Sequence, residues 1–170
     1  MTETTADRGA QQALFSPPYL NDTTGYLGRT VCRITGITYR QLDYWTRSGL
    51  VSATITPAKG CGSTRLYSFR DLLEIKIITK LLDVGLSLQK VRTAVHQLDC
   101  LGIEELASAT LFSDGVSVYH CYSSEEIIDL LADGQGVFGV AVPGLVSQMT
   151  ATLRTLPVEE RKNQPYTHVA

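Results

Sequence analysis

The fold of this chain is decided by residues 36–50, which read GITYRQLDYWTRSGL. Thr38 is a favourable N-cap and predicts a helix over 39–48, ended by the glycine that follows. Within that helix, Leu42 and Trp45 lie three residues apart and share one face, which we expect to pack inward. The opposite face is left to polar, charged and tyrosine side chains.

A shorter helix is predicted just before this one. Val31, Cys32 and Ile34 give residues 29–35 a short apolar face, and the glycine at 36 ends it. Two short helices joined by a tight turn that contains glycine are typical of a helix-turn-helix.

The segment that follows predicts a β-hairpin over residues 51–67. Residues 51–56 and 64–67 are compatible with strands, and the glycine-rich stretch between them is turn material that carries Lys59. Such a hairpin after a helix-turn-helix is the expected place of a wing.

Two further helices complete this half of the chain. Ser68 caps the first, with Asp71 as the acidic partner of a capping box, and Ser87 caps the second, which runs to Leu98. The order of helix, turn, helix, hairpin, helix, helix predicts a winged helix-turn-helix over residues 24–98.

The rest of the sequence predicts a different architecture. Short strand-like stretches alternate with helical ones over residues 99–157, which indicates a small C-terminal α/β module. Residues 1–23 are polar with a Pro-Pro step and predict a flexible N-terminal arm, and 158–170 predict a tail. The fold class expected for the whole chain is mainly α with small β content.

Charge is distributed unevenly along the 170 residues. The formal charge is −2, but residues 24–97 hold eleven Lys and Arg against four Asp and Glu, a net +7. Residues 98–170 hold three basic and ten acidic residues, a net −7. The near-neutral total therefore does not argue against nucleic acid, because the positive charge is confined to the predicted helix-turn-helix.

Residues 29–98 resemble the N-terminal domain of MerR-type transcriptional regulators. The resemblance rests on residues 36–50, on Arg65-Leu66-Tyr67-Ser68 in the hairpin and on the GLSLQKV run at 85–91. The YRQLDYW motif, with the later LFSDG and GQGVFG runs, resembles the sequences of an actinobacterial branch of the family.

The resemblance implies a sequence-specific DNA-binding transcriptional regulator that is not an enzyme. Such a protein binds promoter DNA as a homodimer, here through recognition helix 39–48 and wing 51–67. Double-stranded DNA and RNA polymerase are then the expected partners, and growth or cell-division genes are the targets that the resemblance suggests.

Nine residues are predicted to contact DNA. Arg40 lies in the first turn of the recognition helix, where side chains reach base edges, and Arg65 matches the family's wing arginine. Tyr44 either contacts DNA or is partly buried beside Trp45. The predicted set is Thr38, Tyr39, Arg40, Asp43, Tyr44, Arg47, Lys59, Arg65 and Tyr67.

Two features depart from the family pattern. Asp43 stands where the family usually has arginine; it either tunes specificity by accepting from cytosine or pairs locally with Arg40 or Arg47. After Leu98 there is no sustained heptad pattern for the family's long dimer helix. The candidate dimer surface is instead an apolar stripe near the C-terminus, and its alternative is a structural cap behind the DNA-binding domain. The stripe consists of Leu145, Met149, Leu153 and Leu156.

Other functions were weighed against the same residues. No cofactor is predicted, and no nucleophile, phosphate-loop or metalloprotease motif is present. One alternative is a metal- or ligand-responsive regulator that senses through the C-terminal module, with Cys100 and Cys121 as alternative metal ligands. Another is a protein-interaction module without DNA binding. The sequence shows no signal-peptide pattern and no long apolar run, so we expect a cytoplasmic, nucleoid-associated protein without a membrane partner.

Overall fold

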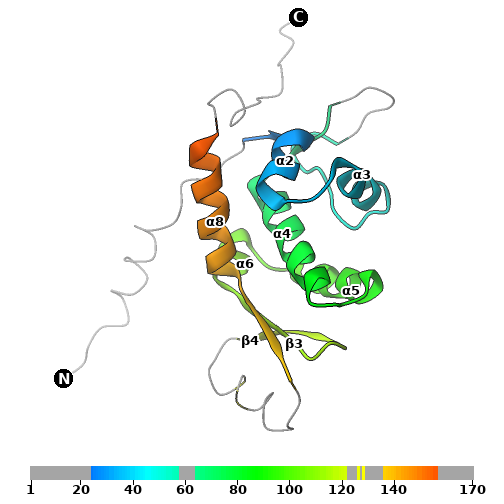
Figure 1. Cartoon of the computed structure of the whole chain (residues 1–170), viewed down its shortest axis with the longest axis vertical. Helices are drawn as coiled ribbons and strands as arrows, with labels where there is room; N and C mark the ends of the chain where they lie inside the picture. Colours follow the sequence, from blue (N-terminus) through cyan, green and yellow to red (C-terminus); the bar gives the residue numbers. More distant parts are fainter. Residues whose placement is uncertain (1–23, 58–63, 122–125, 127, 129–135, 157–170) are drawn as a thin grey trace, which may run out of the picture.

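The chain is described by a computed structural model, in which residues 24–57, 64–121, 126, 128 and 136–156 are placed (Figure 1). It is mainly helical with two small sheets, which confirms the expected fold class. The elements are β1 (Tyr26–Leu27), α2 (Gly28–Thr35), α3 (Tyr39–Arg47), β2 (Leu66–Tyr67), α4 (Phe69–Asp83), α5 (Leu88–Leu98), α6 (Ile103–Ser108), β3 (Thr110–Ser113), β4 (Val118–Cys121), β5 (Phe138–Ala141) and α8 (Val142–Thr155).

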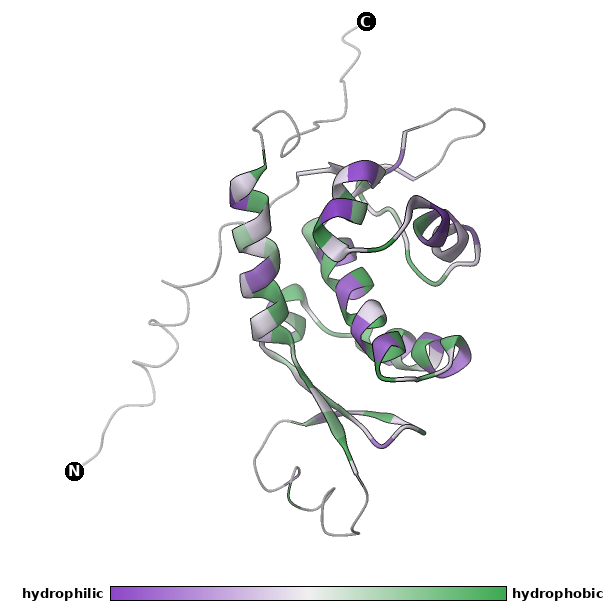
Figure 2. Cartoon of the chain, viewed as in Figure 1, coloured by the Kyte–Doolittle hydropathy of each residue, from purple (hydrophilic) through white to green (hydrophobic). Residues whose placement is uncertain are grey.

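Helix α4 lies at the centre of the molecule and contacts α2, α5 and α8. Because neighbours cover it from several sides, its apolar positions are buried around most of its circumference rather than along one stripe. The buried side chains include Leu72, Leu73, Ile75, Ile77 and Ile78. Figure 2 shows hydrophilic and hydrophobic residues alternating along each helix, as expected for helices that pack on one side and face solvent on the other.

The helix-turn-helix forms as the local signals predict. Gly36 ends α2 with a φ of 82°, a left-handed conformation that glycine adopts without steric cost. Thr38 then caps α3 in a capping box with Gln41: the Thr38 hydroxyl oxygen accepts from the Gln41 amide at 3.2 Å. The Gln41 side chain in turn accepts from the Thr38 amide at 2.9 Å.

The predicted hairpin over 51–67 is formed only in part. Among its described residues, Thr56 and Leu66 make a single antiparallel bridge, and residues 51–55 form no strand. The strand β2 also pairs with β1, in the register Tyr26 to Tyr67. The predicted pairing within 51–67 is thus limited to the bridge between Thr56 and Leu66, and the regular strand partner comes from residues before the helix-turn-helix. The tip, with Lys59, lies outside the described residues.

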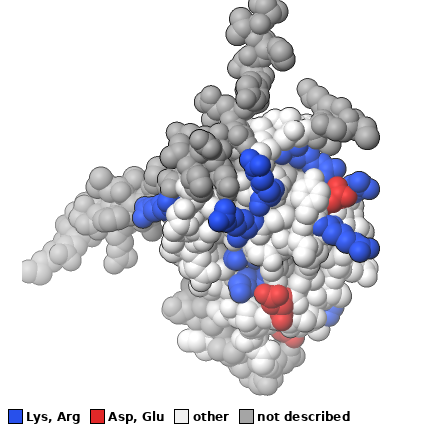
Figure 3. Space-filling view, turned by 45° about the horizontal axis from the view of Figure 1, so that its top comes forward, with Lys and Arg blue, Asp and Glu red and all other residues white. Residues whose placement is uncertain are grey.

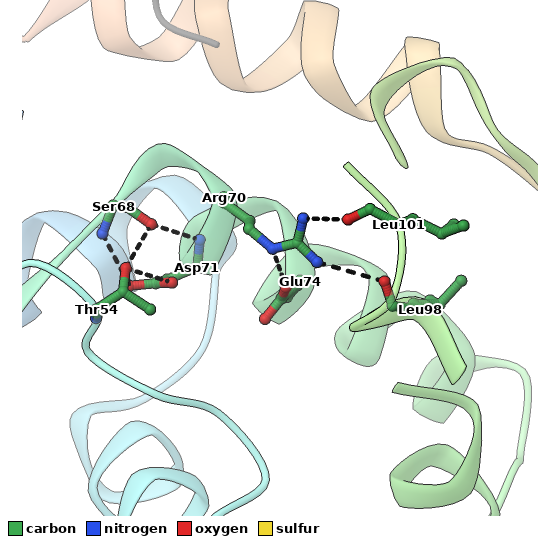
Figure 4. A network of polar contacts seen from close by, with 7 residues as sticks. All are labelled: Thr54, Ser68, Arg70, Asp71, Glu74, Leu98 and Leu101. Atoms are coloured by element: carbon green, nitrogen blue, oxygen red, sulfur yellow. Dashed lines mark hydrogen bonds and ion pairs between the residues drawn. The ribbon is translucent and has the colours of Figure 1, made fainter. Parts of the chain in front are cut away.

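A buried carboxylate joins this wing segment to α4 (Figure 4). Asp71 accepts from the Ser68 amide at 2.8 Å, and Ser68 Oγ accepts from the Asp71 amide at 3.1 Å, so the predicted capping box is confirmed. The same carboxylate also accepts from the amide and the hydroxyl of Thr54, each at 2.9 Å. One side chain therefore both begins α4 and holds the base of the wing.

A partly buried ion pair fixes the end of α5 against α4. The Arg70 guanidinium pairs with Glu74 at 2.8 Å and donates to the carbonyls of Leu101 at 2.6 Å and Leu98 at 3.3 Å (Figure 4). Burial raises the pKa of Glu74 from 4.5 to about 7, although the neighbouring guanidinium opposes this rise. Desolvation thus outweighs the ion pair at this position.

The C-terminal part consists of α6, a three-stranded antiparallel sheet in the order β4-β3-β5, and α8. Helix α8 packs against α6, α4 and α2, while the sheet extends away from the helices (Figure 1). The stripe proposed as a dimer surface lies on the inner side of α8. Its four side chains are buried in the core of the same chain: Leu145, Met149, Leu153 and Leu156.

That burial corrects the expectation of a dimer surface on α8. The stripe has the helical periodicity of any face that packs against a partner, and here the partners are helices of the same chain. The structural cap, which was the alternative interpretation, describes α8. The predicted N-terminal arm and C-terminal tail lie outside the described residues.

The shared role of Asp71 predicts a large effect of a small substitution. Asp71→Asn keeps the size of the side chain but replaces one acceptor oxygen with an NH2 group, which cannot accept the hydrogen bonds that Asp71 receives. We therefore expect the free energy of unfolding to fall by about 1–3 kcal/mol. Urea denaturation followed by circular dichroism measures this. Asp83→Asn is the control on the same helix, since the Asp83 side chain is 59% exposed, and should change stability by less than about 0.5 kcal/mol. Equal effects of the two substitutions would contradict the role of Asp71.

The raised pKa of Glu74 predicts a dependence of stability on pH. Between the unfolded pKa of 4.5 and the folded value of about 7, the folded state holds more protons, so stability falls as the pH rises through this window. We expect Glu74→Gln to remove this fall, which is up to about 3 kcal/mol. Urea midpoints of both proteins at pH 5 and pH 8 test it, and parallel profiles would refute the assignment.

Candidate nucleic-acid interface

Helix α3 presents one face to the core and one to solvent. Leu42 and Trp45 are buried, as predicted. On the outward side Tyr39 is 66% and Tyr44 57% exposed, and the side chain of Arg40 is also exposed. Tyr44 is thus not buried beside Trp45, and the outward face combines cationic and aromatic groups. Such groups contact phosphates, sugars and base edges in DNA-binding proteins.

Further cations surround this face. Arg29 and Arg33 on α2 are exposed, as is Arg47 at the end of α3. Figure 3, which turns the top of Figure 1 forward, shows Lys and Arg side chains spread over the surface with few acidic ones among them. The face drawn in Figure 3 thus carries more Lys and Arg than Asp and Glu side chains.

Asp43 lies between two arginines on this surface. One carboxylate oxygen is 3.0 Å from Arg47 Nε, and the other accepts from Arg65 Nη1 at 2.9 Å. The local pairing expected with Arg47 is confirmed, but the other partner is Arg65 rather than Arg40. The hydrogen bond to Asp43 raises the pKa of Arg65, so the guanidinium stays charged. This ion pair joins the recognition helix to the base of the wing.

Tyr67 does not contact DNA in this arrangement, because its side chain is buried. Its hydroxyl lies 3.0 Å from Thr46 Oγ1, and Thr46 donates its own proton to the Leu42 carbonyl at 2.8 Å. The Tyr67 hydroxyl is therefore the donor to Thr46, and burial raises its pKa. Tyr67 was predicted to contact DNA, and its burial contradicts that prediction; it ties β2 to the second half of α3. The hydroxyl of Thr38 is likewise engaged in capping α3.

Two cations that were not among the predicted site residues hold the ends of helices. Lys76 Nζ donates to the Thr35 carbonyl at 3.1 Å, at the end of α2, and burial lowers its pKa. Arg92 Nη1 donates to the Ser48 carbonyl at 2.8 Å, just after α3. Positive groups stabilise the carbonyls at helix C-termini, so these contacts fix both helices of the helix-turn-helix. Sequence reasoning missed them because the partners are more than forty positions apart.

The two cysteines of the C-terminal part differ in solvent exposure. Cys100 is exposed and Cys121 is buried, where burial raises the pKa of its thiol. Within the described ranges, no three His, Cys, Asp or Glu side chains lie close enough together to hold a metal ion. In the same part of the chain, no helix has the length and apolarity needed to cross a membrane.

Comparison with known proteins agrees with this geometry. Residues 26–98 match the family described as "MerR HTH family regulatory protein". The chain is also similar to HTH-type transcriptional regulators from Mycobacterium bovis and from two strains of Mycobacterium tuberculosis. Each is 53% identical over 133 residues, which make up 78% of this chain and 59% of the relative.

The chain thus spans somewhat more than half the length of these relatives. The matched residues 26–98 contain both helices of the helix-turn-helix, the wing and helices α4 and α5. By this match, residues 26–98 form a domain of the MerR HTH family of regulatory proteins, and the chain as a whole is similar to HTH-type transcriptional regulators.

Proposed function

We propose that this protein is a DNA-binding transcriptional regulator that places α3 in the major groove of promoter DNA. The observation that carries the proposal is the outward face of α3, where Tyr39, Arg40 and Tyr44 are exposed while the opposite face is buried. A helix anchored in this way presents its first turn to base edges, as in other helix-turn-helix proteins. The family match supports the same interpretation.

Each exposed residue has a role that follows from its chemistry. Arg40 in the first turn of α3 suits bidentate donation to guanine. Tyr39 and Tyr44 suit contacts with sugar and phosphate, and Arg47 suits a phosphate at the far end of the helix. Arg65 suits a backbone contact from the wing base, although it is already paired with Asp43. Lys59 would extend these contacts from the wing tip.

We propose further that the protein binds as a homodimer on an inverted repeat. A single helix-turn-helix contacts too few base pairs for useful specificity, and symmetric dimers solve this by reading two half-sites. Because the apolar stripe of α8 is buried within the chain, the contacts between the two copies must come from other surfaces. RNA polymerase is a further proposed partner and the nucleoid the proposed location, both by resemblance to the family. Analytical ultracentrifugation with and without a selected duplex tests the dimer, and a monomer in both would refute it.

The role of Arg40 is tested with DNA that the protein itself selects. The protein is first used to enrich binding sites from a pool of duplexes with a randomised centre. We then expect Arg40→Ala to weaken binding to the enriched duplex about 5- to 150-fold, because a bidentate base contact is lost. Fluorescence anisotropy on the enriched duplex and on a scrambled duplex measures the change.

Lys80→Gln is the matched control, since it removes one positive charge from α4, where Lys80 already faces Asp83. It should change the affinity for either duplex only slightly. Unchanged affinity of Arg40→Ala for the enriched duplex would refute the assignment of Arg40. If no duplex is enriched or bound at moderate salt, the protein-interaction alternative is favoured instead.

A further inference from the structure

A carboxylate in the middle of a DNA-binding surface requires an explanation. Asp43 lies on α3 one turn from both Arg40 and Arg47, on the face that carries the exposed tyrosines. Near phosphate, a negative charge lowers affinity for every DNA sequence alike. The benefit of Asp43 must therefore come from how it positions other side chains, and not from attraction between its own charge and DNA.

The contacts of Asp43 suggest what that contribution is. Its carboxylate uses one oxygen for Arg47, four residues along the same helix, and the other for Arg65, 22 positions away at the base of the wing. Each contact is made by one nitrogen of a guanidinium, and a guanidinium has five N–H donors. The other N–H donors of both arginines are therefore held in position and can still donate to other acceptors.

Other contacts show that the fold does not depend on this pair. Tyr67 already binds Thr46 on α3, and Asp71 already holds Thr54 at the base of the wing. The side chains of Asp43 and Arg65 are 28% and 22% exposed, and ion pairs that water reaches add little to stability. What Asp43 adds is the direction of the Arg65 and Arg47 side chains.

We propose that Asp43 is a positioning residue that sets the ratio of specific to non-specific DNA binding. It fixes Arg65 and Arg47 relative to the recognition helix, so that both reach phosphate only when α3 occupies its specific position in the major groove. Its negative charge weakens binding to all other DNA. This inference rests on the proposed function, since it requires that α3 and the wing base contact DNA. It assigns the acidic residue a role through its two arginines and no direct base contact.

The test compares Asp43→Asn with the wild type on two duplexes. One duplex is enriched by the wild type from the randomised pool, and the other is a scrambled duplex of the same composition. We expect the variant to bind the scrambled duplex more tightly, because one negative charge is gone, and the enriched duplex less tightly. The ratio of the two affinities should fall about tenfold.

Two further variants separate positioning from general effects. Asp83→Asn removes a carboxylate from the end of α4 and should leave the ratio unchanged. Arg65→Gln should lower the ratio by itself but lower it no further in the Asp43→Asn background, because the two residues act as a unit. Thermal melts of all variants accompany the binding measurements.

The possible results lead to different conclusions. If Asp43→Asn strengthens binding to both duplexes equally, the carboxylate acts only by its charge and the proposal is overturned. It is also overturned if both affinities fall together with the melting temperature, since that is a structural effect. A wild type that enriches no duplex would refute the proposed function itself, and with it this inference; a wild type that enriches one, with an unchanged ratio in the variant, would refute the inference alone.

Discussion

The structure depends on the buried carboxylate of Asp71. It accepts hydrogen bonds from Ser68 at the start of α4 and from Thr54 in the segment that follows the recognition helix. From Thr54 the constraint passes through the bridge between Thr56 and Leu66 to β2, and from Tyr67 through Thr46 to α3. A buried carboxylate left without these donors would be strongly destabilising, so the wing base and α4 keep one relative position. The recognition helix is oriented by that same series of contacts.

The positive charge of the helix-turn-helix serves two purposes. Arg70, Lys76 and Arg92 donate to carbonyls at the ends of α5, α2 and α3, where they stabilise helix termini. Exposed arginines on α2 and α3, among them Arg40, leave the outer surface positive. Some of the positive charge of residues 24–97, notably that of Arg70 and Lys76, is therefore engaged in holding the fold together.

The C-terminal part contributes to the same hydrophobic core as the helix-turn-helix. Helix α8 lies against α2, α4 and α6, so its apolar stripe is enclosed by helices from both halves of the sequence. The helix-turn-helix is thereby supported from behind by residues that lie about one hundred positions away. A surface for a second copy of the chain has to be sought on the exposed parts, not on this stripe.

The sequence by itself determined the elements whose signals are local. Thr38, Ser68 and Ser87 cap helices through contacts only three residues long, and the spacing of Leu42 and Trp45 already indicates which face of α3 packs inward. The motif of residues 36–50, with the shorter runs at 65–68 and 85–91, indicated the family whose model matches residues 26–98.

Only the tertiary structure decided which groups meet across long separations. It paired β2 with β1, buried Tyr67 and the α8 stripe, and joined Asp43 to Arg65. Periodicity shows that a face needs a partner but does not name that partner. Burial and ion pairing depend on which segments the folded core brings together, and no local spacing carries that information.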